Sequence, residues 1–333
     1  MRTSRHFTHM LMALFAVLVM SATALAADPG LPFPATSEAS DQKAGSILYY
    51  NAYTSNAANP LAADTRINIT NTNSATGIAV HLFFVDAALC QPADSFICLT
   101  ANQTASFLTS DVDPGISGYI VAVASDLNGL PVQFNFLIGD EYVEYASGHA
   151  ANLGAVAFAK VNPGATVSTD GTLALLSFNG VDYNAAPRVV ALDNIQARAD
   201  ANDTLLILNR VGGNLATGAA TLTGGGQPNL FGILYDDAET PLSFTFAAAV
   251  CQFRSSITNS FPRTAPRVES VIPAGRSGWM KIFSLIDIGI VGAQINRNTG
   301  GSDSGAFNGG HNLHHLRLTN AATLIIPIFP PNC

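Results

Sequence analysis

The chain is dominated by short segments that alternate polar and apolar residues and are separated by clusters of turn formers. In the stretch 64–86, DTRINITNTNSATGIAVHLFFVD, the run 66–70 has the two-residue period of a half-buried strand. Residues 71–77 are rich in turn formers. The next run, 80–85, is apolar on both faces, which is typical of a central strand in a covered sheet. This pattern predicts an all-β protein.

A similar order of segments returns at residues 203–237, where DTLLILNRVGGN leads on to FGILYDD. Between the two copies, VNPGATVSTDG at 161–171 collects Pro, Gly and Asp, which favour a boundary. The repeat predicts two antiparallel β-sandwich domains in tandem, residues 43–160 and 161–333. Convergence of strand patterning is the alternative to duplication, because the repeat lies in the order of elements and not in residue identity.

The turn Asp126-Leu127-Asn128-Gly129 predicts a hairpin, since Asn-Gly favours the tight turns that join paired strands. The strands on its two sides would be GYIVAVAS at 118–125 and PVQFNFLIG at 131–139. Short strands with turn signals about ten residues apart are typical of a sandwich.

Residues 64–138 resemble an immunoglobulin-like sandwich module found in many secreted, largely uncharacterised bacterial proteins. The resemblance lies in the pieces INITNTNS, VHLFFVD, LTANQTASF, GYIVAVAS and PVQFNFL, in that order. It implies two immunoglobulin-like domains with an adhesive or spacer role, and it carries no catalytic residues. The segment between Cys90 and Cys98 departs from the plain module.

The N-terminus predicts a cleaved signal peptide over residues 1–26. Arg2 and Arg5 precede the apolar run MLMALFAVLV, and Ala24-Leu25-Ala26 offers a small-x-small cleavage site. Residues 27–42 contain three prolines and are expected to form a flexible lead-in. No later stretch is long and apolar enough to span a bilayer. We therefore expect a secreted protein, extracellular or periplasmic.

Charge and cysteine content narrow the class further. Only 11% of the residues are charged, against about 25% in an average protein, and the formal net charge is −8. No basic cluster is present, which argues against a nucleic-acid partner. The four cysteines, Cys90, Cys98, Cys251 and Cys333, fit no zinc-ribbon spacing, and an even number in an exported chain predicts disulfides. Three pairings are possible, and we expect one bridge per domain, Cys90–Cys98 and Cys251–Cys333.

The densest group of potential metal ligands is His311, His314 and His315 in GGHNLHHL. On a strand, His311 and His315 would share one face and His314 would lie on the other, whereas in a loop all three could converge on a metal ion. Asp303 is the one carboxylate close in sequence. Histidines that satisfy loop backbone are the alternative reading.

A second group, Asp140, Glu141, Glu144 and His149, could hold Ca²⁺ or act in glycoside hydrolysis. A solvated connecting segment explains the same residues without any ligand. No cofactor is expected unless Ca²⁺ binds here. Trp279 follows a glycine-containing turn and is a candidate anchor for sugar or protein, with a core position as the alternative.

No nucleophile elbow, phosphate-binding loop or catalytic-cysteine arrangement appears in the chain. We therefore expect a non-enzymatic protein of the cell surface or secreted fraction, with a role in structure, adhesion or assembly and a surface glycan or protein as partner. The alternatives are a carbohydrate-binding or metal-stabilised module, and a secreted hydrolase that uses the carboxylates of residues 140–144.

Overall fold

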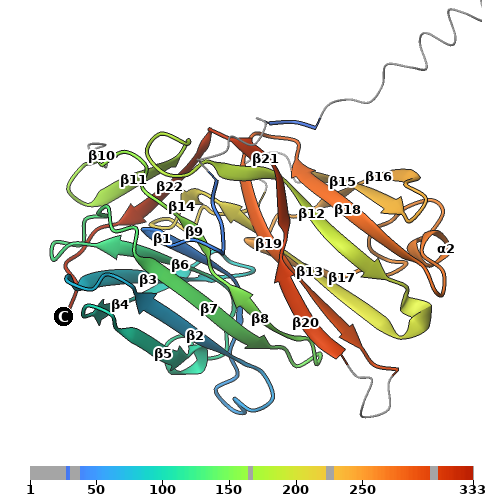
Figure 1. The fold of residues 1–333 in the computed structure, drawn as a ribbon, viewed down its shortest axis with the longest axis horizontal. Coiled ribbons are helices and arrows are strands. Elements are labelled where there is room, and N and C mark those ends of the chain that lie inside the picture. The colour runs from blue at the N-terminus through green and yellow to red at the C-terminus, as the bar shows by residue number, and fades with distance from the viewer. Residues whose placement is uncertain (1–27, 31–37, 164–167, 223–228, 301–306, 333) are drawn as a thin grey trace, which may run out of the picture.

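The computed structural model describes residues 28–30, 38–163, 168–222, 229–300 and 307–332 (Figure 1). Strands dominate this part of the chain. Its helical elements are the single turn α2 (Val268–Val271) and the 3₁₀ turns η1 (Thr109–Asp111) and η2 (Arg198–Asp200). The all-β prediction is confirmed. The described residues contain no helix with the length and apolar content needed to cross a bilayer.

The strands form five sheets of four or five strands, which we call blades 1 to 5 in the order in which they pack. Blade 1 consists of β10 (Ser168–Thr169), β11 (Leu173–Phe178), β22 (Ala322–Pro327) and β14 (Gly213–Asn214). Blade 2 consists of β4 (Pro92–Leu99), β3 (Ile78–Asp86), β6 (Ser117–Ser125), β1 (Ile47–Thr54) and β9 (Val156–Phe158). Blade 3 consists of β5 (Thr104–Leu108), β2 (Asp64–Asn71), β7 (Leu137–Glu144) and β8 (Ala150–Gly154).

The remaining blades carry the candidate site. Blade 4 consists of β17 (Gln252–Ser256), β13 (Asn202–Val211), β19 (Gly289–Asn298) and β20 (Phe307–Asn312). Blade 5 consists of β16 (Pro241–Ala247), β15 (Asn229–Asp236), β18 (Ser277–Ser284), β12 (Ala186–Gln196) and β21 (His314–Thr319). Within each blade, neighbouring strands pair antiparallel, except that β14 pairs parallel with β22.

Four apolar clusters join each blade to the next. One cluster lies between blades 1 and 2, a second between blades 2 and 3, a third between blades 3 and 4, and a fourth between blades 4 and 5. Ala186 of blade 5 belongs to the cluster between blades 1 and 2, so the order returns to its start. The five sheets are therefore arranged as the blades of a five-bladed β-propeller.

The predicted pair of tandem immunoglobulin-like sandwiches is wrong. In an antiparallel sandwich each sheet buries one face, whereas blades 2, 3 and 4 bury apolar side chains on both faces. In β3, Leu82 and Phe84 pack toward blade 3, while Phe83 and Val85 pack toward blade 1. The apolar pattern of residues 80–85 shows that both faces are covered, but it does not show which sheet covers each face.

The turn at Asp126 exists and the chain pairs antiparallel beside it through Ser125 and Pro131, but the pairing predicted along the full length of both strands is wrong. The Leu130 N–H lies 2.9 Å from the Asp126 side chain, and Gly129 has a φ of +83°, as the tight turn requires. The strands on either side belong to different blades, since β6 pairs with β1 and β3 while β7 pairs with β2 and β8. The turn thus carries the chain from blade 2 to blade 3.

The preferred disulfide pairing is also wrong. Cys90, after β3, is bonded to Cys251, before β17, across 161 residues, with their Cα atoms 5.3 Å apart. Cys98 is disulfide-bonded as well, and Cys333 lies outside the described residues. The Cys90–Cys251 bridge joins the two predicted domains to each other. The signal peptide over residues 1–26 and Asp303 also lie outside the described residues, so the signal peptide stays a prediction.

A buried polar network centred on Asn51 of β1 connects blades 2 and 4. Its side-chain amide donates to the carbonyl oxygen of Gly292 at 3.1 Å and to Oδ1 of Asn312 at 2.7 Å. Its backbone carbonyl accepts from the side-chain amides of Asn209 at 2.8 Å and Gln252 at 3.1 Å. Asn51 of β1 is thus hydrogen-bonded to residues of all four strands of blade 4. A buried polar group that is left without its partner costs about 1–3 kcal/mol.

Replacing Asn51 with Ala should lower the free energy of unfolding by about 1–3 kcal/mol, because Oδ1 of Asn312 loses its donor, whereas the carbonyl of Gly292 keeps the N–H of Leu313. Urea denaturation followed by tryptophan fluorescence measures the change. Asn152→Ala, an exposed asparagine on β8, is the matched control and should change stability by less than about 0.5 kcal/mol. An equal effect of the two substitutions would contradict the role assigned to the network.

Non-reducing peptide mapping of the oxidised protein should find Cys90 linked to Cys251. Replacing both with Ala should lower the free energy of unfolding by about 2–5 kcal/mol, because a long loop of the unfolded chain is no longer closed. Recovery of a peptide pair joined by Cys90 and Cys98 would contradict the structure.

Candidate metal centre

Asp193 is presented by a β-bulge in β12. This strand pairs with β18 through Leu192 and Met280 and again through Ile195 and Gly278, so β12 carries one residue more than its partner. A bulge of this kind redirects the side chain at its site. Leu192 and Ile195 point into the core between blades 4 and 5, and the carboxylate of Asp193 stays at the surface. The amide of Gln294, a fully buried residue of β19, donates to the backbone carbonyl of Asp193 at 3.0 Å.

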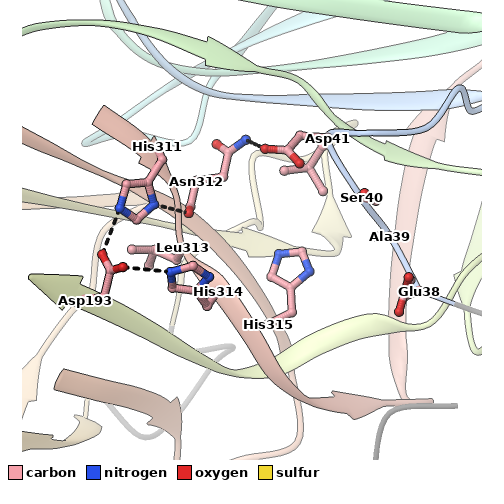
Figure 2. A pocket seen from close by; sticks show the side chains of 11 residues that line it. Glu38, Ala39, Ser40, Asp41, Asp193, His311, Asn312, Leu313, His314 and His315 are labelled. Carbon is pink, nitrogen blue, oxygen red and sulfur yellow. Dashed lines mark hydrogen bonds and ion pairs between the residues drawn. The ribbon is translucent and has the colours of Figure 1, made fainter. Parts of the chain in front are cut away.

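His311 and His314 are brought together where the chain passes from β20 to β21. His311 pairs with Gln294 in blade 4, and His314 pairs with Ala191 in blade 5. Between them, the buried Leu313 donates its backbone N–H to the carbonyl of Gly292 at 2.9 Å. The change of blade at Leu313 breaks the strand alternation, so the two histidines lie on the same side of the chain as Asp193 (Figure 2).

The three side chains are within coordination distance of a single ion. Oδ1 of Asp193 lies 2.9 Å from Nε2 of His311, and Oδ2 lies 3.2 Å from Nε2 of His314. One ligand atom from each residue lies within 4.8 Å of the other two. The side chains are 42% exposed for His311, 52% for Asp193 and 55% for His314, so an ion can enter from solvent.

Proton accounting gives the contact between His311 and Asp193 two favourable states. Nδ1 of His311 lies 2.8 Å from the backbone carbonyl oxygen of Asn312, so Nδ1 is the nitrogen that carries the proton. In the neutral ring, Nε2 then presents a lone pair to the carboxylate of Asp193, which is also an acceptor. The contact is favourable only when Nε2 is protonated or when a metal ion lies between the two atoms. A backbone carbonyl that fixes the tautomer in this way is a common feature around metal-binding histidines.

The electrostatics keep Asp193 ionised. Partial burial raises the pKa of its carboxyl, but the hydrogen bond from His314 and the charges of His311 and His314 outweigh burial and hold the pKa below its ordinary value. Asp193 is therefore a carboxylate at neutral pH and can act as a metal ligand without losing a proton.

The cluster opens onto a cavity of about 440 Å³. Asp41, Glu38 and His315 also line this cavity, and Figure 2 shows His315 between the Asp193–His314 pair and Glu38. Oδ2 of Asp41 accepts from the side-chain amide of Asn312 at 2.8 Å. Burial lowers the pKa of His315 to about 4, so its ring is neutral at neutral pH.

The three histidines predicted from the sequence are not arranged as they would be on one continuous strand. His311 and His314 share the site, and His315 lies apart from their contact with Asp193. The sequence analysis missed Asp193, which is 118 residues before His311, as well as Asp41 and Glu38. The signal that could have found Asp193 is the polar pair Asp193-Asn194, which interrupts the apolar run from Val189 to Ile195.

The second predicted group does not converge. Asp140 and Glu144 lie on one face of β7 and Glu141 on the other. Asp140 accepts from the side-chain amide of Asn68 at 2.8 Å, and Glu144 is exposed. The buried His149 contacts the hydroxyl of Ser147 at 3.0 Å, and burial lowers its pKa. Metal binding or catalysis by this group stays a prediction that the geometry does not support.

Glu141 is a buried carboxyl group. Oε1 accepts the backbone N–H of Ala52 at 3.0 Å, and Oε2 has no hydrogen-bond partner among the described residues. Burial raises its pKa well above the ordinary value, and the hydrogen bonds from Ala52 and Asn51 lower it less. Glu141 is part of the packing between β7 and β1.

Trp279 stacks on Tyr235 of the neighbouring strand, with ring centroids 4.1 Å apart and planes inclined by 6°. The ring is half-buried on the face of blade 5 that points away from blade 4. It does not line the cavity beside Asp193. Its role as a ligand anchor stays a prediction.

Comparison of the chain with models of known protein families, with characterised proteins and with solved structures gives no match. The resemblance of residues 64–138 to immunoglobulin-like modules of secreted proteins is not tested by these comparisons, and the fold that it implied is corrected above.

Glu141→Gln should raise the melting temperature at pH 7.5 by a few degrees and leave it nearly unchanged at pH 4. Because the folded-state pKa is raised, the unfolded chain loses the proton first, and stability falls as the pH rises above the ordinary value of 4.5. Glutamine keeps the acceptor for Ala52 and does not ionise. Glu144→Gln, on the exposed end of the same strand, should leave the pH profile unchanged, and an identical profile for Glu141→Gln would contradict the account.

Proposed function

We propose that this chain is an exported β protein that binds one divalent transition-metal ion through Asp193, His311 and His314, and that it acts as a binding module without covalent chemistry. The observation that carries the proposal is the convergence of three ligand atoms within 4.8 Å of one another from β12, β20 and β21. The signal-like N-terminus and the disulfide between Cys90 and Cys251 support export.

The ligand set favours zinc over calcium. Zinc binds imidazole nitrogen and carboxylate oxygen at about 2.0–2.2 Å, and a tetrahedral arrangement then separates the ligand atoms by about 3.3 Å. Oδ1 of Asp193 lies 2.9 Å from Nε2 of His311 and Oδ2 lies 3.2 Å from Nε2 of His314, and one ligand atom from each residue lies within 4.8 Å of the other two. Calcium takes six to eight oxygen ligands, which two histidines do not supply.

The position of the ion explains what it would do for the fold. His311 belongs to blade 4, whereas His314 and Asp193 belong to blade 5. One ion bound to all three would link the segment around Leu313, where the chain passes from β20 to β21, to the bulge of β12. The metal would therefore stabilise the contact between these two blades, and its free coordination position would face the cavity.

The other functions predicted from the sequence have less support from the geometry of the structure than metal binding has. A role in surface structure, adhesion or assembly stays a prediction, since it depends on the partner of the chain. Hydrolysis by the carboxylates of residues 140–144 is not favoured, because Glu141 is buried on the opposite face of β7 from Asp140 and Glu144.

Adding ZnCl₂ to EDTA-treated protein should raise the melting temperature, with a stabilisation of about 2.7 kcal/mol when the free ion is at one hundred times its dissociation constant. CaCl₂ should have no such effect. Differential scanning calorimetry measures both responses.

Variants then locate the ion. His311→Ala and His314→Ala should each lose the response to zinc, because each removes one of three ligands. His315→Gln is the matched control, an adjacent histidine outside the ligand set, and should keep the response. A melting temperature that ignores zinc and EDTA, or a response that survives His314→Ala, would show the proposal to be incorrect.

A further inference from the structure

The ion proposed above would leave one coordination position open. Asp193, His311 and His314 supply three ligands, and sites with three protein ligands commonly keep a fourth position for water or for a bound molecule. The cavity of about 440 Å³ in front of this position is within the size range of small-molecule sites. Its other polar side chains indicate which molecule fits.

The charged groups around the cavity disfavour a charged ligand beside the metal ion. Among the described residues that line it, Asp41 and Glu38 are carboxylates, and no lysine or arginine is present. Lys43 pairs with Glu38 at 3.1 Å and offsets its charge. A divalent ion together with Asp193 and Asp41 would make the centre close to neutral. An anionic ligand would meet Asp41, and a cationic ligand would meet the metal, so a neutral ligand is favoured.

The hydrogen-bonding side chains of the cavity favour a ligand that donates hydrogen bonds. Oδ2 of Asp41 already accepts from Asn312, but a carboxylate has about four lone-pair positions and keeps capacity for more donors. His315 lines the same cavity, and an imidazole ring can accept through one nitrogen. With the metal ion bound, the cavity would combine an ion that binds a ligand atom through its lone pair with acceptors that bind a hydrogen-bond donor. A hydroxyl group supplies both.

We infer that the cavity binds a neutral, hydroxyl-rich ligand of the monosaccharide class, with one hydroxyl oxygen on the metal ion and neighbouring hydroxyls donating to Asp41 and His315. This inference rests on the proposed metal site. Vicinal hydroxyls suit it because one molecule can offer a lone pair to the metal and hydrogens to two acceptors, and Asp41 and His315 both line the cavity.

Isothermal titration of zinc-loaded protein with D-glucose, D-galactose, D-mannose and glycerol tests the inference, with sodium acetate as the anionic comparator. At least one monosaccharide should bind, more tightly than acetate and at least ten times more tightly than to EDTA-treated protein. In cobalt-substituted protein, the same sugar should change the visible absorption of the ion, since a hydroxyl replaces water in its coordination.

Asp41→Asn should weaken the sugar about tenfold, because a hydrogen bond to a charged acceptor is lost. Asparagine can still accept from Asn312, so zinc affinity should be unchanged. If zinc binds and none of the sugars does, if acetate binds more tightly than every sugar, or if Asp41→Asn leaves sugar affinity unchanged, the inference is overturned and the metal proposal stands. If zinc itself does not bind, both fail.

Discussion

The hydrogen bond between the buried Asn51 and the partly buried Asn312 is the contact on which the rest of the structure depends. Asn51 lies in blade 2 and Asn312 ends the last strand of blade 4, so the bond joins these two blades. The other groups of Asn312 reach the candidate site. Its backbone carbonyl accepts from His311, and its side chain donates to Asp41 at 2.8 Å. The polar network that holds the blades together is therefore continuous with the groups that position the metal ligands and the cavity wall.

Much of the strand content could be predicted from the sequence, whereas the arrangement of the strands could not. The alternation of residues 66–70 and the apolar run 80–85 correspond to β2 and β3. The predicted fold was wrong because the sequence pattern does not show which distant strands pack against each other. A run that is apolar on both faces, such as Val80 to Val85, fits a sheet covered on both sides in many architectures. The turn at Asp126 likewise specifies a reversal of direction but not whether the chain re-enters the same sheet. The cysteines were misassigned for the same reason, since the expectation of one bridge per domain favoured Cys90–Cys98 over a bond to the distant Cys251.

The candidate site shows the same division between local and long-range information. The cluster of histidines was visible in GGHNLHHL, and two of its members meet in the structure. Their partner Asp193 was not visible, because a bulge in a strand far away in the sequence delivers it. The prediction that His311 and His315 share a face assumed an unbroken strand. The buried Leu313 ends that alternation, so the spacing of three residues between His311 and His314 brings them together instead.

Anomalous diffraction from crystals grown with zinc, collected on both sides of the zinc absorption edge, tests the central claim most directly. The account predicts one strong peak about 2.0–2.2 Å from Nε2 of His311, Nε2 of His314 and a carboxylate oxygen of Asp193. A peak at other residues, or no peak beside Asp193 at a saturating zinc concentration, would contradict it.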